Sequence, residues 1–355
     1  MRDLVKSSSE IKVFCGIDFH KNTSTLAMLD SQGREIEPVT KIQTKNLRTF
    51  LSNRKDWKIG IEATGGVNHV VDGLKADGHE VIIINPNQFR GIGIGGKKTD
   101  SRDAMALANG LRLGFAPEVY HKSKTSRELK SLLTTREQMV QTRVGFMSHI
   151  RGTLREYGEV FPVGVRSFFE EAPIRIGRIE NEFLKRALEN ALKQIKEFER
   201  QEKEIDESIR ELLSEREEVK LLKTIPGVGP VIAALFIAVV DDIERFSDSK
   251  QFASYLGLVP SVSASANTCH MGSITRSGSE MLRRNLIHGA RAWLKYAPTS
   301  DRNRIWAENV KSRRGMNKAT VALAHRMARI GFAILKSKKA YYCSEKKKYS
   351  PPVAA

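Results

Sequence analysis

Residues 11–20, IKVFCGIDFH, decide how the start of the chain is interpreted. The run is largely apolar and short, which predicts a buried strand. Two further runs, TSTLAMLD (23–30) and REIEPVTKI (34–42), follow after turns and predict two more strands in hairpin order. Asp18 interrupts the first run, and an unpaired buried carboxylate is costly. We therefore expect Asp18 to be exposed at a sheet edge, paired, or bound to a metal.

Helix and strand signals alternate in the segments that follow. NLRTFLSNR (46–54) and VNHVVDGLKADG (67–78) predict helices, whereas WKIGIEA (57–63) and EVIIINP (80–86) predict strands. Three strands in hairpin order and then alternating helix and strand favour an α/β, RNase H-like domain over residues 1–124. Other mixed sheets begin in a similar way.

Apolar residues recur every seven positions in the middle of the chain. They are Leu133, Val140, Met147 and Leu154, and, after the break GEVFPVGV (158–165), Leu184, Ala191, Phe198, Ile205 and Leu212, interleaved with Leu188, Ile195 and Ile209. Charged residues fill most other positions, so residues 125–218 predict a coiled-coil connector, with a solvated single helix as the alternative. The two stretches can fold back on each other or pair between subunits.

The segment 219–342 predicts a mostly α-helical domain, followed by a basic tail, 343–355. In LLKTIPGVGPVIAALFIAVV (221–240), Gly227 and Gly229 flank a turn similar to a helix-hairpin-helix, whose backbone N–H groups can hold a DNA phosphate. A glycine turn between core helices is the alternative. A stretch rich in Ser, Thr and Gly, 251–284, lies within this helical domain. Helix packing alone does not explain such a polar stretch, which makes it a candidate for function.

The composition favours a polyanionic partner. The 355 residues carry 59 Lys+Arg and 41 Asp+Glu, a formal net charge of +18, and phosphates release counterions when lysine and arginine bind them. The three cysteines are widely spaced, which indicates neither a zinc site nor a disulfide framework. No apolar run is long enough to span a membrane, and the first residues lack a signal-peptide core, so we expect a cytoplasmic protein without a membrane partner.

Four carboxylates stand out as candidate ligands. In GGKKTDSRDAMALANG (95–110), Asp100 and Asp103 share one helix face at spacing i, i+3. They also suit an ordinary acidic first turn, because the helix dipole favours acids there. With Asp18, and with Glu62 at the end of its strand, they make four hard oxygen ligands of the kind that bind one or two Mg²⁺ ions. Such ions can clamp both oxygens of a phosphodiester displacement.

The segment GIGIGGKK, from Gly91, partly matches a P-loop. Lys98, however, occupies the position where a P-loop needs Ser or Thr for magnesium. The segment also begins several residues after its strand. We favour a basic loop near nucleic acid, with Lys97 and Lys98 as binding residues.

Motifs along nearly the whole chain resemble the DEDD insertion-sequence transposases, relatives of the Piv DNA invertase that are also called bridge recombinases. The first half carries GIDFHKNTSTLAML, IGIEATGGVNH, VIIINP and KKTDSRDAMALA; the second half carries TIPGVGPVIAA, FASYLGLVPSVSASANTCHMGSITRSGSEMLRR and KATVALAHRMARI. The resemblance implies a RuvC-like domain, a coiled-coil connector and a serine-bearing transposase domain that build a composite active site.

The resemblance also implies roles for individual residues. Asp18, Glu62, Asp100 and Asp103 match the family's metal-binding quartet, and Ser265 matches its nucleophile. Ala266 follows that serine where the family commonly has glycine, and Ser261 and Ser263 are close by, so all three serines stay candidates. Arg276, in GSITRSG (272–278), is implied to contact phosphate; a turn that caps the next helix is the alternative.

The function implied is DNA recombination through a covalent phosphoserine with Mg²⁺ as cofactor. The partners implied are DNA at the element ends and target, a structured non-coding guide RNA, and further copies of the chain in a dimer or tetramer. The setting would be the nucleoid of a bacterial or archaeal cell. A RuvC-like metal-dependent junction nuclease would need the quartet without the serine, and a non-catalytic nucleic-acid-binding protein would need neither.

Overall fold

The computed structural model describes residues 13–90, 99–162, 164–265 and 268–342. The chain forms two compact units, which divide between His121 and Lys122. The predicted RuvC-like segment ended three residues later, at 124. The arm helices and the C-terminal helices fall within one unit, and their division into separate domains stays a prediction.

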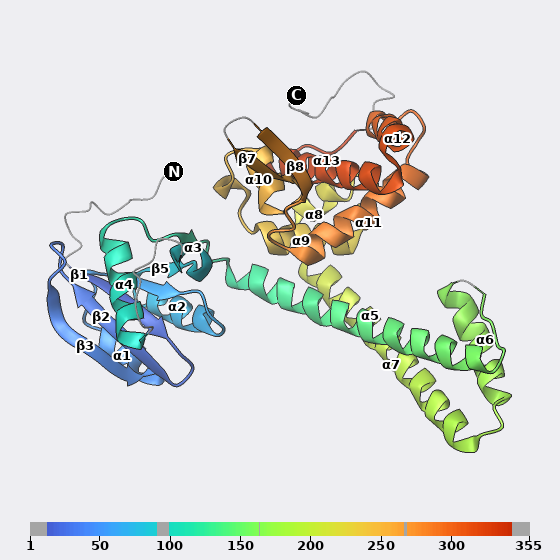
Figure 1. Ribbon diagram of the computed structural model, residues 1–355, viewed down its shortest axis with the longest axis horizontal. Coiled ribbons are helices and arrows are strands. Elements are labelled where there is room, and N and C mark those ends of the chain that lie inside the picture. The colour runs from blue at the N-terminus through green and yellow to red at the C-terminus, as the bar shows by residue number, and fades with distance from the viewer. Residues whose placement is uncertain (1–12, 91–98, 163, 266–267, 343–355) are drawn as a thin grey trace. The chain divides into compact units, whose positions relative to one another are not determined.

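The first unit is a mixed α/β structure, as predicted (Figure 1). Its elements in chain order are β1 (Val13–Phe19), β2 (Thr23–Leu29), β3 (Glu35–Gln43), η1 (Thr44–Asn46), α1 (Leu47–Leu51), β4 (Trp57–Glu62), α2 (Val67–Ala76), β5 (Glu80–Ile84), α3 (Pro86–Arg90), α4 (Asp100–Arg112) and β6 (Glu118–Val119).

The strands form one sheet in the order β3-β2-β1-β4-β5-β6. β1, β2 and β3 pair antiparallel, β4 and β5 extend the sheet parallel to β1, and β6 closes it antiparallel to β5. The hairpin order of the first three strands is confirmed. That the sheet belongs to the RNase H-like class stays a prediction.

Helices cover both faces of this sheet. Alternate residues of a strand point to opposite faces, so Cys15 and Ile17 face α1 and α2, whereas Gly16 faces α4. A Cβ atom at Gly16 would lie 2.2 Å from the carbonyl oxygen of Ala104 and 2.3 Å from the amide nitrogen of Ala108. Glycine at position 16 therefore lets α4 pack directly on the backbone of β1.

The second unit is mostly helical, as predicted, with one short hairpin. Its elements in chain order are α5 (Lys124–Glu156), α6 (Val165–Gly177), α7 (Glu182–Leu212), α8 (Glu217–Leu222), α9 (Pro230–Val240), η2 (Ile243–Arg245), α10 (Ser249–Tyr255), β7 (Pro260–Ser265), β8 (Thr268–Ile274), α11 (Glu280–Tyr296), α12 (Arg302–Arg314) and α13 (Met316–Ser337).

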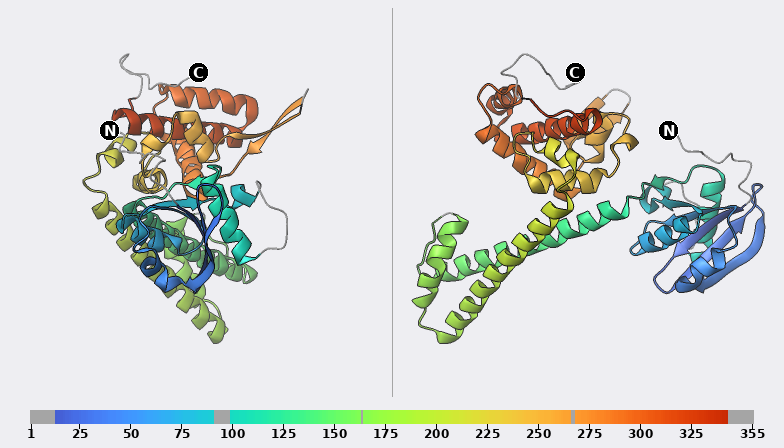
Figure 2. Two further views of the ribbon diagram at one scale, coloured as in Figure 1. Left: turned by 90° about the vertical axis from the view of Figure 1, so that its left-hand side faces the viewer. Right: turned by 180° about the vertical axis from the view of Figure 1, so that it is seen from behind.

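The long helices α5 and α7 fold back on each other within one chain, and with α6 they form an arm (Figure 2). Leu133, Met147 and Leu154 are buried, as the seven-residue spacing predicts. On α7 the buried residues are Leu188, Leu192, Ile195 and Ile209, whereas Leu212 is exposed. The interleaved residues Leu188, Ile195 and Ile209 are thus buried, and the other predicted positions before Leu212 are partly buried. That this pair is a coiled coil stays a prediction.

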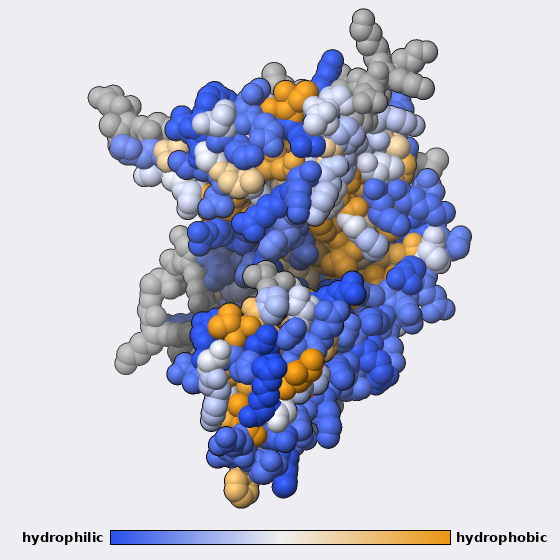
Figure 3. Space-filling model, turned by 90° about the vertical axis from the view of Figure 1, so that its right-hand side faces the viewer, coloured by the Kyte–Doolittle hydropathy of each residue, from blue (hydrophilic) through white to orange (hydrophobic). Residues whose placement is uncertain are grey.

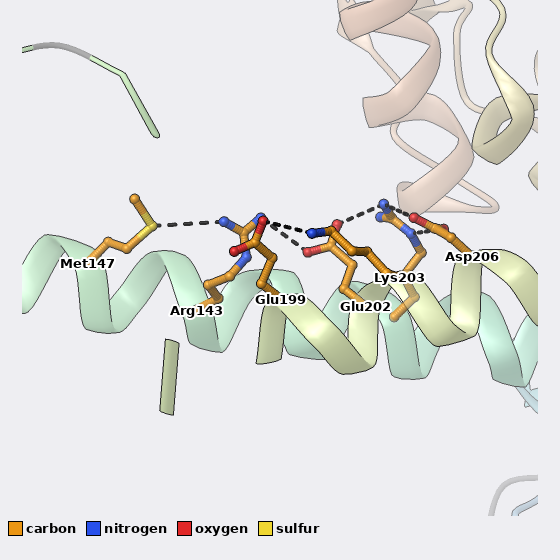
Figure 4. A network of polar contacts seen from close by, with 7 residues as sticks. Arg143, Met147, Glu199, Glu202, Lys203 and Asp206 are labelled. Carbon is orange, nitrogen blue, oxygen red and sulfur yellow. Dashed lines mark hydrogen bonds and ion pairs between the residues drawn. The ribbon is translucent and has the colours of Figure 1, made fainter. Parts of the chain in front are cut away.

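A polar network crosses the arm between α5 and α7 (Figure 4). The Glu202 carboxylate lies 2.8 Å from a guanidinium nitrogen of Arg136 and 3.1 Å from one of Arg143. Asp206 pairs with Arg136 as well, at 2.5 Å. These side chains are mostly withdrawn from solvent, so the network fixes how the two helices align.

A large apolar core joins the base of the arm to the remaining helices. α9 is its centre, with every residue from Ile232 to Val240 buried against neighbours that include Leu286 and Leu323. Within the ranges that the structure describes, no helix is both long and apolar enough to cross a membrane.

Replacing Glu202 tests the arm network. Glu202→Gln leaves two largely buried guanidinium groups without the carboxylate between them, and breaking such a pair costs about 3 kcal/mol. We expect a lower midpoint of urea unfolding, followed by far-UV circular dichroism. Glu204→Gln on the same helix removes only an exposed partner of Arg200 and should leave the midpoint unchanged. Equal midpoints for the two variants would contradict this role.

Replacing Gly16 tests the contact between α4 and β1. Gly16→Ala introduces a methyl group into backbone atoms that cannot move aside easily, and overpacking of this kind costs about 1–3 kcal/mol or more. The thermal unfolding temperature of the first unit should fall. Gly65→Ala is the matched control, because a Cβ there meets no atom within 4 Å. A fall of the same size in the control would mean that the contact is unimportant.

Candidate active site

A row of polar side chains crosses four neighbouring strands, β3, β2, β1 and β4, near one end of the strands. Asp18 in β1 is paired with Thr25 in β2, and Thr25 is paired with Lys41 in β3. On the other side, β4 runs parallel to β1 in a register that places its last residue, Glu62, beside Asp18. Directly opposed residues point to the same face of a sheet. The four side chains therefore share the face that α4 covers.

The helix α4 begins above this row. Thr99 caps it by accepting a hydrogen bond from the backbone N–H of Arg102, at 3.3 Å. Asp100 and Asp103 lie in its first turn. Because α4 packs on β1 at Gly16, its N-terminus lies at the end of the strand that carries Asp18. Carboxylates from elements far apart in the sequence thus come together.

Three side chains form the centre of the cluster. His20 Nε2 lies 3.2 Å from Asp18 Oδ2 and 4.0 Å from Asp100 Oδ1. One potential ligand atom from each of the three residues lies within 4.8 Å of those of the other two. A further cation, the Lys41 ammonium, lies 2.9 Å from Asp100 Oδ2.

The electrostatics differ between the two aspartates. Burial raises the pKa of Asp18; the nearby His20 lowers it, and the charges of Asp100 and Asp103 raise it. The pKa of Asp100 is lowered, chiefly by its hydrogen bond with Lys41. The ionised form of Asp18 is therefore disfavoured unless a cation lies close to it.

The cluster fits a hard divalent cation. Besides the carboxylates, the Thr25 hydroxyl is buried, with no hydrogen-bond partner in the described part of the chain. It lines a hollow of about 370 Å³ together with Lys41 and Asp100. Buried polar atoms normally have partners, so an orphaned hydroxyl beside acidic oxygens supports a bound ion and its water. The His20 nitrogen either adds a ligand to these oxygens or hydrogen-bonds to the Asp18 carboxylate.

The predicted quartet is only partly drawn together. Asp18 and Asp100 belong to the group of three, whereas Glu62 and Asp103 lie outside it in the described structure, although Asp103 is near enough to influence Asp18. Sequence reasoning missed His20 and Lys41. His20 stands two residues after Asp18 in GIDFH, and that period-two spacing was the signal available for it.

The candidate residues of the second unit lie around the hairpin β7–β8, which extends from the helices (Figure 2, left). Ser265 is the last residue of β7 and is paired with Thr268 in β8. Ser261 and Ser263 are exposed on the same strand. The stretch rich in Ser, Thr and Gly therefore contains a β-hairpin, which the sequence pattern did not predict. Which serine is the nucleophile stays a prediction.

The other predicted contacts to nucleic acid have different settings. Gly227 has a positive φ of 80°, and a Cβ there would lie 2.1 Å from the Gly289 carbonyl oxygen of α11. This close packing accounts for the glycine by itself, and a phosphate-binding role for the turn with Gly229 stays a prediction. Arg276 is exposed, with a strained φ of 58°. Lys97 and Lys98 lie outside the described residues.

Two models of known protein families match parts of this chain. A family model described as a transposase of the DEDD, IS110 type matches residues 15–159, and a model of the "Transposase IS116/IS110/IS902 family" matches residues 219–304. The first match contains the carboxylate cluster, and the second contains the β7–β8 hairpin. Together they define a DEDD-type transposase.

Relatives match over nearly the full length. The transposase for insertion sequence element IS1111A of Coxiella burnetii is 29% identical over 95% of this chain and 93% of its own length. A putative transposase of Sinorhizobium fredii, y4pF/y4sB, is 28% identical over 96% and 88%, and the IS1328 transposase of Yersinia enterocolitica is 24% identical over 90% and 95%. The chain belongs to the IS110 family of transposases, enzymes that cut and rejoin DNA.

Removing one carboxylate tests the metal site. Asp18→Asn removes a charge that burial disfavours, so the metal-free variant should unfold at a slightly higher temperature than the wild type. Saturating Mg²⁺ or Mn²⁺ should raise the unfolding temperature of the wild type, because a ligand held at about 100 times its Kd stabilises the folded state by about 2.7 kcal/mol. The variant should not respond.

Asp56→Asn is the control for this measurement, because Asp56 is an exposed acid of the same unit outside the cluster. It should respond to the metal as the wild type does. A metal response that persists in Asp18→Asn would place the site elsewhere.

Proposed function

We propose that the chain is a DNA recombinase whose first unit is an RNase H-like, RuvC-like domain. Asp18, Glu62, Asp100 and Asp103 would bind Mg²⁺ there. The observation that carries the proposal is the polar row across four strands beneath the acidic N-terminus of α4. Strand pairing and helix packing bring these acids to the same end of the sheet. Acids that serve only to keep a surface soluble need not lie close together.

Each residue around the cluster would have a distinct task. A bound Mg²⁺ would polarise the scissile phosphate and stabilise the oxygen that leaves. Asp18 is the most buried of the four acids and would anchor the ion. His20, at 3.2 Å from Asp18, would orient that carboxylate. Lys41 neutralises Asp100 and would hold its carboxylate in place.

Ser265 would supply the nucleophile from the second unit. Its oxygen would form a bond to phosphorus while the bond from phosphorus to a deoxyribose oxygen breaks. The serine gives up its proton to solvent, and the departing deoxyribose oxygen takes one up. The covalent phosphoserine keeps a phosphodiester-like linkage, so strands can be exchanged and rejoined without ATP. The support for this serine is the family resemblance around GLVPSVSAS (257–265).

The proposal includes partners. A structured non-coding guide RNA would pair with element and target DNA at the nucleoid, and the chain would act as a dimer or tetramer. Exposed apolar side chains at the end of the arm support self-association: Val160, Val165, Ile174 and Phe183 are at least half exposed. Figure 3 faces this side of the molecule, where apolar patches show among hydrophilic side chains.

Covalent trapping tests the mechanism. Purified protein is incubated with Mg²⁺, co-expressed RNA and labelled element-junction DNA, then denatured and resolved on a gel. We expect a protein–DNA adduct with the wild type and none with Ser265→Ala or Asp18→Asn, because one removes the nucleophile and the other the metal anchor. Ser261→Ala and Ser263→Ala serve as matched controls and should keep the adduct.

The other outcomes are equally informative. An adduct that survives Ser265→Ala but not Ser263→Ala would move the nucleophile along β7. Cleaved ends without any adduct would contradict the recombinase mechanism and indicate a metal-dependent nuclease.

A further inference from the structure

The second unit contains a groove of about 1370 Å³ that the cleavage mechanism does not use. Its walls come from α11, α12, α13 and the region of the β7–β8 hairpin. α11 and α13 lie side by side there (Figures 1 and 2). Cationic side chains dominate its polar lining, and Glu280 is the one acid among the described residues that line it.

Two helical stripes carry four of the cations, Arg284, Arg291, Lys318 and Arg329, together with Glu280, Ile287, Ala322 and His325. On α11, residues 280, 284, 287 and 291 line the groove, and on α13, residues 318, 322, 325 and 329 do so. Both sets follow the spacing i, i+4, i+7, i+11, which keeps side chains on one helix face. Each stripe is about 16 Å long at a helical rise of about 1.5 Å per residue. Arg291 and Lys318 lie at ends of the two stripes.

Much of this charge has no carboxylate partner. Arg284 pairs with Glu137 and Glu280. In the structure as described, no ion pair within 4.0 Å involves Arg291, Lys318 or Arg276, and all three are exposed. An unneutralised row of cations is unfavourable for folding by itself, and an anionic ligand would remove that cost.

The inner cations also repel one another. Burial lowers the pKa of Arg326, and the charge of Arg329 lowers it further. The pKa of His325 is lowered by burial and then by both arginines. Arg326 stacks on the Trp306 ring, 3.6 Å from its centroid. This stacking holds the Arg326 guanidinium at the groove, although burial and the charge of Arg329 disfavour its protonated form.

The groove is also lined by five apolar residues, Leu258, Ile274, Ile287, Val321 and Ala322, which we call its apolar floor. Helices in contact have axes about 8–10 Å apart, which leaves a channel too narrow for a duplex between the stripes. A single strand meets both features, because its phosphates can reach the cations while unpaired bases lie on the apolar floor.

We propose that this groove binds a single strand of DNA. The choice of DNA over RNA rests on the proposed function; the choice of a single strand rests on the groove alone. The phosphates contact the cations of the two stripes, and the bases contact the apolar side chains that line the groove.

Fluorescence anisotropy of a labelled strand of about 16 nucleotides tests the groove, with EDTA present so that no cleavage occurs. We expect Arg291→Ala/Lys318→Ala to weaken binding by about tenfold or more at about 0.15 M salt. The slope of log K against log salt should fall by about 1.4, since each lost phosphate contact removes about 0.7 for a single strand. An abasic strand of equal length should bind the wild type more weakly.

The control removes the same charge elsewhere. Arg186→Ala/Lys193→Ala takes two exposed cations from the arm helix α7 and should leave the affinity nearly unchanged. Asp18→Asn and Ser265→Ala should bind as the wild type does, so failure of the cleavage mechanism would not affect this result.

Four outcomes would overturn the inference. If both double variants lost affinity for the strand equally, the change would reflect the net charge of the protein and not the groove. If an abasic strand bound as tightly, the bases would not contact the apolar floor. A duplex that depends more strongly on Arg291 and Lys318 would replace the single strand, and an equal-length RNA that binds more tightly would overturn the choice of DNA.

Discussion

The contact between α4 and the backbone of β1 at Gly16 determines the geometry of the candidate active site. A helix is a rigid rod with a fixed rise, so fixing Ala104 and Ala108 over Gly16 also fixes where the helix begins. That beginning lies over the strand end that carries Asp18. A side chain at position 16 would push α4 away from the sheet and separate Asp100 and Asp103 from Asp18. The geometry of the candidate active site therefore depends on the absence of one methyl group at Gly16.

The same contact creates an electrostatic conflict. Asp18 is buried near Asp100 and Asp103, and both the burial and these charges disfavour its ionised form. The N-terminus of α4 offsets part of this cost through its dipole, and His20 and Lys41 offset more. A site arranged in this way is less stable than a neutral one of the same shape. Such a cost is reasonable where a cation is to be bound, because the same repulsion strengthens its binding.

Only part of this arrangement could be predicted from the sequence. Asp18 was identifiable because a carboxylate within an apolar strand is unusual, and Asp100 and Asp103 because their spacing puts them on one helix face. Lys41 and Thr25 were not, since they join the site only through the register of β2 and β3. The apolar spacing predicted α7 and named Leu188, Ile195 and Ile209, which are buried, but it also named Leu212, which is exposed, because burial depends on how α5 packs against α7.

For a similar reason, the net charge of the chain does not show which basic residues can bind a polyanion. The arm contains many arginines and lysines, but carboxylates on the same or the facing helix pair with many of them, as Glu202 does with Arg136 and Arg143. Those charges serve folding and are not available to a distant anion. Along the groove, Arg291 and Lys318 have no such neighbour in the described structure. Whether a basic residue binds a polyanion therefore depends on its surroundings, and the +18 of the whole chain cannot supply that information.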